Sequence, residues 1–198
     1  AIFAYANLSM VLTRLDRKDE ALQVLQQGLQ IRPSASLYGM LGHLSMSSRD
    51  YVAAAAAFRK ATSPESGNPR SYENWLELGE ALLHLEGMQK ESRESFEKAL
   101  ELITIRSNMM PNDGWSMAIK ARIHARLGDL ERAQELAKKS VTLAPKNPAV
   151  HACAAVVFVL SGKPNEASKE IELVRQLGFP EKYLKSESVF DSLLSKKK

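Results

Sequence analysis

The sequence has very little cysteine, because Cys153 is the only one among its 198 residues. A disulfide within the chain is therefore excluded, and with it the small secreted folds that disulfides hold together. Cys153 lies in the apolar run HACAAVVFVL, where an inert buried thiol is the expected state. This run is the longest apolar stretch, and it is much shorter than the ~20 residues that a transmembrane helix needs. We therefore expect no membrane insertion.

Glycine and proline are also scarce, at ten and eight residues, and most of them lie between periodic segments. This distribution favours an all-helical fold over a turn-rich sheet. The 27 basic and 23 acidic residues are interspersed, and the final lysines 196–198 supply most of the net charge of +4. We interpret these lysines as a solvated end. The weak basic bias lacks the clustering of a nucleic-acid surface, so no nucleic-acid partner is expected.

Motifs for catalysis and metal binding are missing as well. The chain contains no glycine-rich phosphate loop, no nucleophile elbow, no CxxC and no metal-binding pair of histidines. We therefore expect no enzymatic activity, no cofactor and no metal site.

The stretch from Trp115 to Pro148 has instead the pattern of a helical hairpin. Small residues recur at helical spacing up to Leu127, Gly128 interrupts the pattern, and Asp129 can cap a second helix. The second helix has one apolar face, formed by Ala133, Leu136, Ala137, Ser140 and Val141. Two short helices cannot bury their apolar faces alone, so the hairpin should be one member of a stack.

Four further segments carry the same pattern. The five copies are expected at about residues 2–35, 35–68, 72–106, 114–147 and 148–181, numbered here copy 1 to copy 5. Copy 2 contains Tyr38, Leu41, Gly42, Ala54, Phe58 and Ala61, and copy 3 contains Trp75, Leu78, Gly79, Phe96 and Ala99 at matching places. These residues resemble the tetratricopeptide repeat, a unit of ~34 residues. The resemblance implies an all-α fold, a right-handed α-solenoid of antiparallel helix hairpins, forming a single domain over residues 1–198.

The copies depart from the repeat at identifiable places. Lys120 and Ala121 stand where Leu-Gly is usual in copy 4, which predicts helix contacts made by longer or smaller side chains. The segment 100–110 continues the second helix of copy 3, so we expect that helix to overrun by about one or two turns. Residues 66–71 read as a loop, and the apolar residues of 182–198 should form a cap that covers the last repeat.

The resemblance implies that the first helices form a concave groove that binds a protein or peptide partner. Carried over copy by copy, the partner-binding residues are His43, Leu76, Glu80, His84, Trp115, Arg122 and Arg126. In copy 5 the groove positions are Ala149, Ala152, Val156 and Val159. His124 and His151 occupy packing positions. Ala6, Met10 and Met40 replace the Lys and Asn side chains with which some members of the family clamp a terminal carboxylate, so that clamp is absent.

Two alternatives stay open for individual groove residues. Arg122 and Arg126 can pair with Glu73 or Glu80 of the chain itself, at a gain of under about 1 kcal/mol where exposed. Trp115 can pack over the preceding loop rather than serve as a ligand platform.

A second function is also open for the whole chain. The repeats can be the regulatory or oligomerising tail of a larger signalling enzyme, since the chain begins without methionine and apparently within a helix, as an excised fragment would. Ile2 and Phe3 at this end also suggest self-association through terminal repeats. We expect a cytoplasmic location.

Overall fold

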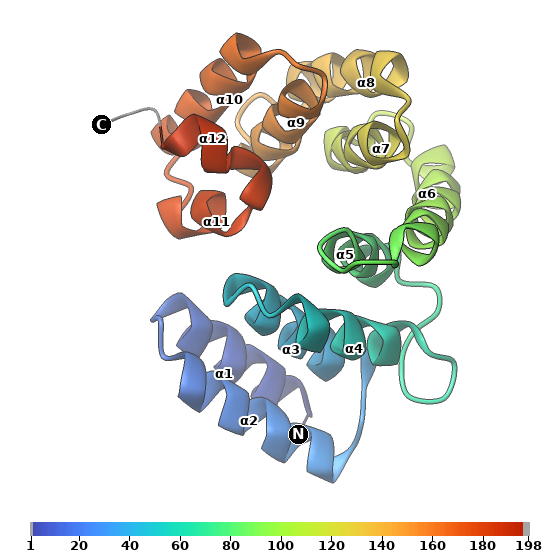
Figure 1. Ribbon diagram of the computed structural model, residues 1–198, viewed down its shortest axis with the longest axis vertical. Coiled ribbons are helices and arrows are strands. Elements are labelled where there is room, and N and C mark those ends of the chain that lie inside the picture. Colours follow the sequence, from blue (N-terminus) through green and yellow to red (C-terminus); the bar gives the residue numbers. More distant parts are fainter. Residues whose placement is uncertain (1, 196–198) are drawn as a thin grey trace. The chain divides into compact units, whose positions relative to one another are not determined.

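The computed structural model describes residues 2–195, which are helical apart from short connections (Figure 1). Ala1 and the predicted solvated lysines 196–198, the last part of the expected cap, lie outside the described residues. The helices are α1 (Ile2–Arg14), α2 (Lys18–Ile31), α3 (Ala35–Ser47), α4 (Tyr51–Thr62), α5 (Tyr72–Leu82), α6 (Gln89–Met109), α7 (Gly114–Leu127), α8 (Leu130–Leu143), α9 (Pro148–Leu160), α10 (Pro164–Gln176), α11 (Glu181–Ser186), the 3-10 turn η1 (Ser188–Phe190) and α12 (Asp191–Leu194). The predicted all-α solenoid of helix hairpins is confirmed.

The chain separates into two compact units, residues 1–99 and 100–198. The first unit contains the hairpins α1–α2 and α3–α4, then α5 and the beginning of α6. The second contains the end of α6, the hairpins α7–α8 and α9–α10, and the segment from α11 to α12. The single continuous domain expected from the sequence stays a prediction.

Each hairpin turns at one residue with a left-handed backbone. The turn of copy 4 is at Gly128, whose φ is 90°, a conformation that glycine adopts without the steric cost of a Cβ. The corresponding residues of the other copies are Asp16 (φ 59°), Arg49 (φ 57°), Gly87 (φ 76°) and Gly162 (φ 68°). The repetition therefore extends to the backbone, even where the side chain differs.

Side-chain caps set where several of these helices begin. The hydroxyl of Ser34 accepts a hydrogen bond from the backbone N–H of Leu37 at the start of α3. The carboxylate of Asp129 does the same for the N–H of Arg132 in α8, as the sequence predicted. These contacts satisfy N–H groups that have no partner within the helix.

In copies 2 and 3 the two helices of the hairpin meet at a glycine–phenylalanine contact. A Cβ added to Gly42 would lie 2.6 Å from the ring of Phe58, and one added to Gly79 would lie 2.7 Å from the ring of Phe96. Both rings are almost completely buried. The glycines are therefore needed because the backbone approaches an aromatic ring too closely for a side chain.

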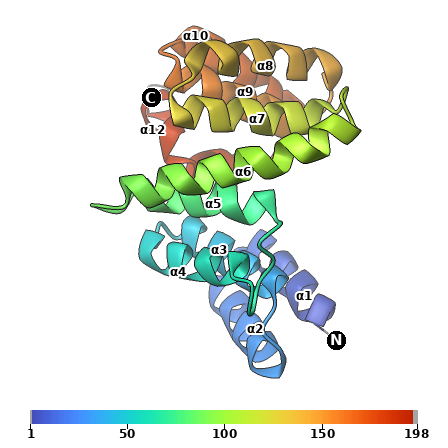
Figure 2. The same cartoon turned by 90° about the vertical axis from the view of Figure 1, so that its right-hand side faces the viewer.

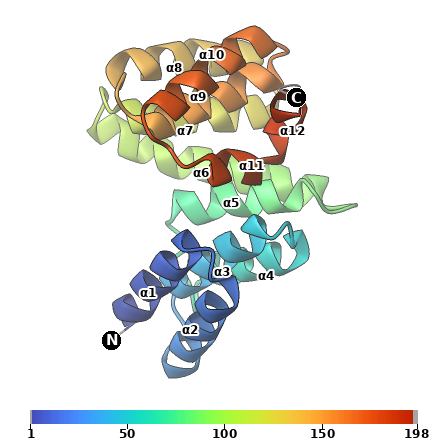
Figure 3. The ribbon, with the colours of Figure 1, turned by 90° about the vertical axis from the view of Figure 1, so that its left-hand side faces the viewer.

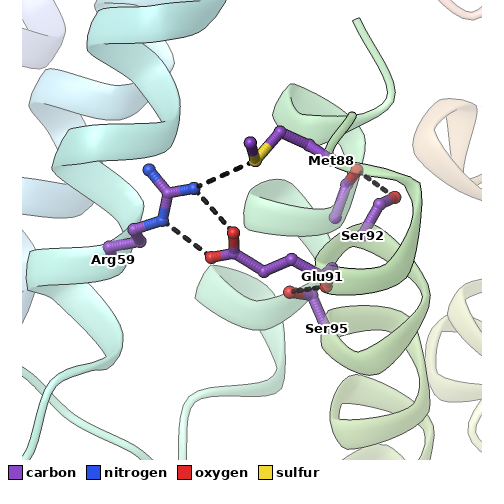
Figure 4. A network of polar contacts seen from close by, with 6 residues as sticks. Arg59, Met88, Glu91, Ser92 and Ser95 are labelled. Atoms are coloured by element: carbon purple, nitrogen blue, oxygen red, sulfur yellow. Dashed lines mark hydrogen bonds and ion pairs between the residues drawn. The ribbon is translucent and has the colours of Figure 1, made fainter. Parts of the chain in front are cut away.

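Copies 2 and 3 are also joined by an ion pair between their second helices. The guanidinium of Arg59 on α4 donates two hydrogen bonds of 2.7 Å to the carboxylate of Glu91 on α6, and it also contacts the sulfur of Met88 (Figure 4). The hydrogen bonds from Arg59 lower the pKa of Glu91 below its usual value. The pair is partly exposed, so its contribution to stability is small.

The long helix α6 confirms the predicted overrun, because it extends for 21 residues to Met109 (Figure 2). Its last turns give Lys120 of α7 a partner: the Lys120 ammonium lies 3.4 Å from the hydroxyl of Ser107. Desolvation by burial, with a smaller effect of Arg132, lowers the pKa of Lys120. The longer side chain predicted at this departure from the repeat therefore does make a helix contact.

Candidate functional site

The predicted partner-binding residues lie on first helices, or just beyond one, in both units. His43 is on α3, Leu76 and Glu80 are on α5, and His84 lies two residues beyond the end of α5. Trp115, Arg122 and Arg126 are on α7 in the second unit.

In the first unit both histidines contact aromatic rings of α4. The ring of His43 meets Phe58 edge to face at 5.4 Å, and the ring of His84 stacks on Tyr51 at 3.8 Å. These rings are therefore already held within the unit. Leu76 and Glu80, one turn apart on α5, are each only 3% exposed.

Asp113 fixes the position of Trp115 at the start of α7. Its carboxylate accepts hydrogen bonds from the backbone N–H groups of Trp115 and Ser116 and from the Ser116 hydroxyl. Partial burial raises the pKa of Asp113, but these hydrogen bonds and the charge of Arg106 outweigh it and hold the pKa below its ordinary value. The side chain of Trp115 is half-buried.

Arg122 forms a two-point ion pair within the second unit. It is buried, and its guanidinium grips the carboxylate of Glu187 with both terminal nitrogens, at 3.1 and 3.2 Å. A planar guanidinium and a carboxylate match in this two-point geometry, which is among the stronger polar contacts in proteins. Arg126, one turn further along α7, is half-buried.

Glu187 belongs to the closing segment, defined as residues 181–195, which contains α11, η1 and α12 (Figure 3). Leu184 and Phe190 of this segment are buried in a cluster with Val156 of α9, and Ala152 and Val159 pack against the same cluster. These three α9 residues occupy positions that the repeat register predicts to face the groove in copy 5. The closing segment therefore packs on the last repeat, at residues that the repeat register predicts to face the groove.

Sequence reasoning missed Glu187 and the path of the closing segment. The one available signal was the spacing of this segment, in which Glu187 stands three residues after Leu184 and three before Phe190. The spacing shows that an acid and two apolar residues can share a helical face, but it does not show which surface they meet.

Other polar groups in the second unit have structural partners. The buried ring of His151 lies between the carboxylate of Glu170, next to Nδ1, and the carbonyl oxygen of Pro145, 3.0 Å from Nε2. This agrees with the packing position predicted for His151. Cys153 is buried as predicted. The part of the chain that the structure describes holds no group of three or more potential metal ligands, and none of its helices has the length and apolar character of a membrane span.

Three segments of the chain match sequence profiles of the tetratricopeptide repeat: residues 4–32, 40–109 and 116–147. Together they span most of the chain. No curated protein sequence matches it.

Solved structures of repeat proteins share the fold. A thermophilic repeat protein of Thermus thermophilus, TTC0263, superimposes with a TM-score of 0.65 at 17% identity, over 96% of this chain and 99% of that one. PilF of Pseudomonas aeruginosa gives a TM-score of 0.57 at 19% identity, over 90% of this chain and 77% of that one. YrrB, described as having an unusual peptide-binding site, gives 0.50 at 19% identity, over 90% and 87% of the two chains.

Proposed function

Because the chain belongs to the tetratricopeptide-repeat family, we propose that it binds a segment of a partner protein on the groove-facing side of its first helices, centred on α7. The repeat profiles and structural neighbours support an interaction or scaffold role in general. The alternative of a regulatory tail on a larger enzyme stays a prediction, as do self-association and the cytoplasmic location.

One observation carries this proposal: Arg122, which the repeat register assigns to the groove, binds the carboxylate of Glu187 from a distant segment of the same chain. Arg126 follows one turn later, and Trp115 lies in the first turn of the same helix, so one helix contains two cationic groups and an aromatic ring. Charged, forked donors beside an aromatic ring are common anchors in protein interfaces.

The first unit contributes less clearly to the proposed contact. His43 and His84 are already engaged by rings of α4, and Leu76 and Glu80 are buried. A partner that used these four residues would have to open the helix packing of the first unit, whereas at Arg122 it would replace a carboxylate of the closing segment, so we propose α7 as the principal contact.

A random-peptide display library tests the proposal. Peptides selected on the full chain should lose most of their binding to the Arg122→Ala, Arg126→Ala variant. The matched control is Arg132→Ala, Lys138→Ala, which removes the same charge from the exposed face of α8. Arg126→Glu alone provides a second variant if the double substitution disturbs folding. Peptides that bind all these variants as well as they bind the unaltered chain would contradict the proposal.

A further inference from the structure

The closing segment (residues 181–195) lies on the surface that the proposed function assigns to a partner. Val156 and the flanking groove positions of α9 contact its apolar residues, while Arg122 of α7 contacts its carboxylate. Leu193 packs against both the core of copy 5 and the core that copies 4 and 5 share. One short segment therefore spans groove positions of two successive repeats.

The structure of this segment depends on the surface beneath it. Its helices have six and four residues, and neither has a side-chain hydrogen bond at its N-terminal cap. Isolated helices this short are unstable in water. Their order must come from contacts with the second unit, as the order of a bound peptide comes from its receptor.

The contacts define a recognition pattern. Leu184 and Phe190 are almost completely buried, and Glu187 stands midway between them, three residues from each. The pattern is an apolar residue, two intervening residues, a glutamate, two further residues and an aromatic residue. Arg122 recognises the central acid, and the α9 surface recognises the apolar residues on either side.

The segment is held at two points by arginine. Arg175, near the end of α10, donates two hydrogen bonds to the carboxylate of Glu181 at 2.9 and 3.0 Å. Arg122 holds Glu187, whose side chain is 31% exposed. The Arg175 contact ties the segment to its own repeat, while the Arg122 contact lies further along, at the surface where a competing carboxylate can enter.

We propose that the closing segment occupies the partner's binding site within the same chain. The partner is then an acidic peptide with the same apolar–glutamate–aromatic pattern. The partner replaces the segment on α7 and α9 and places its carboxylate on Arg122. This inference rests on the proposed function and specifies its ligand. Because the internal segment is tethered beside its site, it competes at a high effective concentration, so a partner binds more weakly while the segment is in place.

The probe for this proposal is a fluorescent peptide with the sequence of residues 181–195, measured by anisotropy against the full chain. Glu187→Gln in the chain weakens the internal competitor, so the probe should bind this variant about tenfold more tightly than the unaltered chain. A probe in which the same glutamate is replaced by Gln should bind the variant at least about tenfold more weakly, because it lacks the charged acceptor.

A second substitution assigns this preference to Arg122. In the Glu187→Gln, Arg122→Gln chain the two probes should bind equally. In the matched control, Glu187→Gln with Arg132→Gln, the difference between the probes should persist. Hydrogen exchange gives a readout independent of the fluorescent label. The probe should increase exchange in the closing segment of the chain while protecting α7 and α9.

Three outcomes would overturn the inference. Equal binding of the two probes to the Glu187→Gln chain would show that Arg122 does not recognise the carboxylate. If peptides from the display library bind through α7 but do not compete with the probe, the proposed function stands and its ligand is different. If light scattering shows dimers that the probe converts to monomers, and no library peptide displaces the segment, the occupant is a second copy rather than a partner.

Discussion

The hairpins of the two units pack different side chains between their two helices. In copies 2 and 3, a glycine on the first helix faces a phenylalanine on the second, Gly42 with Phe58 and Gly79 with Phe96. In copy 4 the corresponding residues are both alanines, Ala121 and Ala137, and both are buried in one cluster. In copy 5 they are Ala155 and Ile171.

This difference shows that different pairs of side chains can occupy these two positions of the repeat. A ring needs a helix without a Cβ opposite it, whereas smaller side chains leave room for a methyl group on both helices. The two units should therefore respond differently to the same type of substitution.

The largest effect is expected for Phe96→Ala in copy 3. The ring is 1% exposed and fills the space beside Gly79, so its removal leaves a cavity and should lower the free energy of unfolding by about 3–5 kcal/mol. Urea denaturation followed by circular dichroism measures the change. Phe3→Ala is the control, because Phe3 is 78% exposed and its loss should change stability by less than about 0.5 kcal/mol. Similar effects of the two substitutions would argue against the glycine–phenylalanine contact as a source of stability.

A converse substitution introduces the glycine–phenylalanine pair of the first unit into the second unit. Ala137→Phe places a ring opposite Ala121, where no space is left for it, and should destabilise the chain by about 1–3 kcal/mol. Adding Ala121→Gly recreates the pair found in copies 2 and 3 and should restore part of the loss. Thermal denaturation of the single and double variants tests this coupling, and strictly additive effects would reject it.

The hairpin turns provide a third comparison. Gly128→Ala forces a Cβ into a left-handed conformation and should cost about 1–2 kcal/mol. Arg49 already carries this strain in copy 2, so Arg49→Gly should stabilise the first unit or leave it unchanged. Hydrogen exchange of the flanking helices resolves the two changes locally. Destabilisation by Arg49→Gly would show that contacts of the arginine outweigh its backbone strain.

The smallest effect concerns the helix caps and depends on pH. Asp113→Ala should cost about 1 kcal/mol at neutral pH. The folded-state pKa of Asp113 is lowered below its ordinary value, so the stabilisation from its ionised form is fully present well above that ordinary value and is lost as the pH falls through the folded pKa. The cost of Asp113→Ala should therefore shrink in acid.

Ser34→Ala is the control for this pH dependence. Ser34 caps α3 in the first unit with a hydroxyl that does not titrate, so the cost of removing it should stay constant with pH. Chemical denaturation at pH 7 and at pH 3 measures both variants. A cost of Asp113→Ala that does not change between these conditions would show that the carboxylate charge contributes nothing to this cap.

Much of the architecture could be predicted from local signals. Helical periodicity located the hairpins, the Gly128–Asp129 pair marked a turn and a cap, and the apolar residues after Leu100 predicted the overrun of α6. These features depend on residues within a few turns of each other, where spacing and backbone preference are informative.

The candidate site was predictable only in part. The repeat register placed Arg122 and Arg126 on one helix, but it could not show that Glu187, 65 residues after Arg122, would supply a carboxylate. Nor could it show that Tyr51 and Phe58 would engage His84 and His43. Such contacts depend on how whole helices pack, and spacing along the chain contains no direct record of them.

By itself, the sequence therefore determined that this protein is a stack of helical hairpins of the tetratricopeptide type, because a repeated pattern of small, apolar and capping residues specifies each hairpin locally. Only the tertiary structure decided that the closing segment packs on α9 and pairs with Arg122 of α7. The physical reason is that the short helices of this segment have no stable structure of their own. Their position follows from apolar surface and a buried cation that other helices bring together.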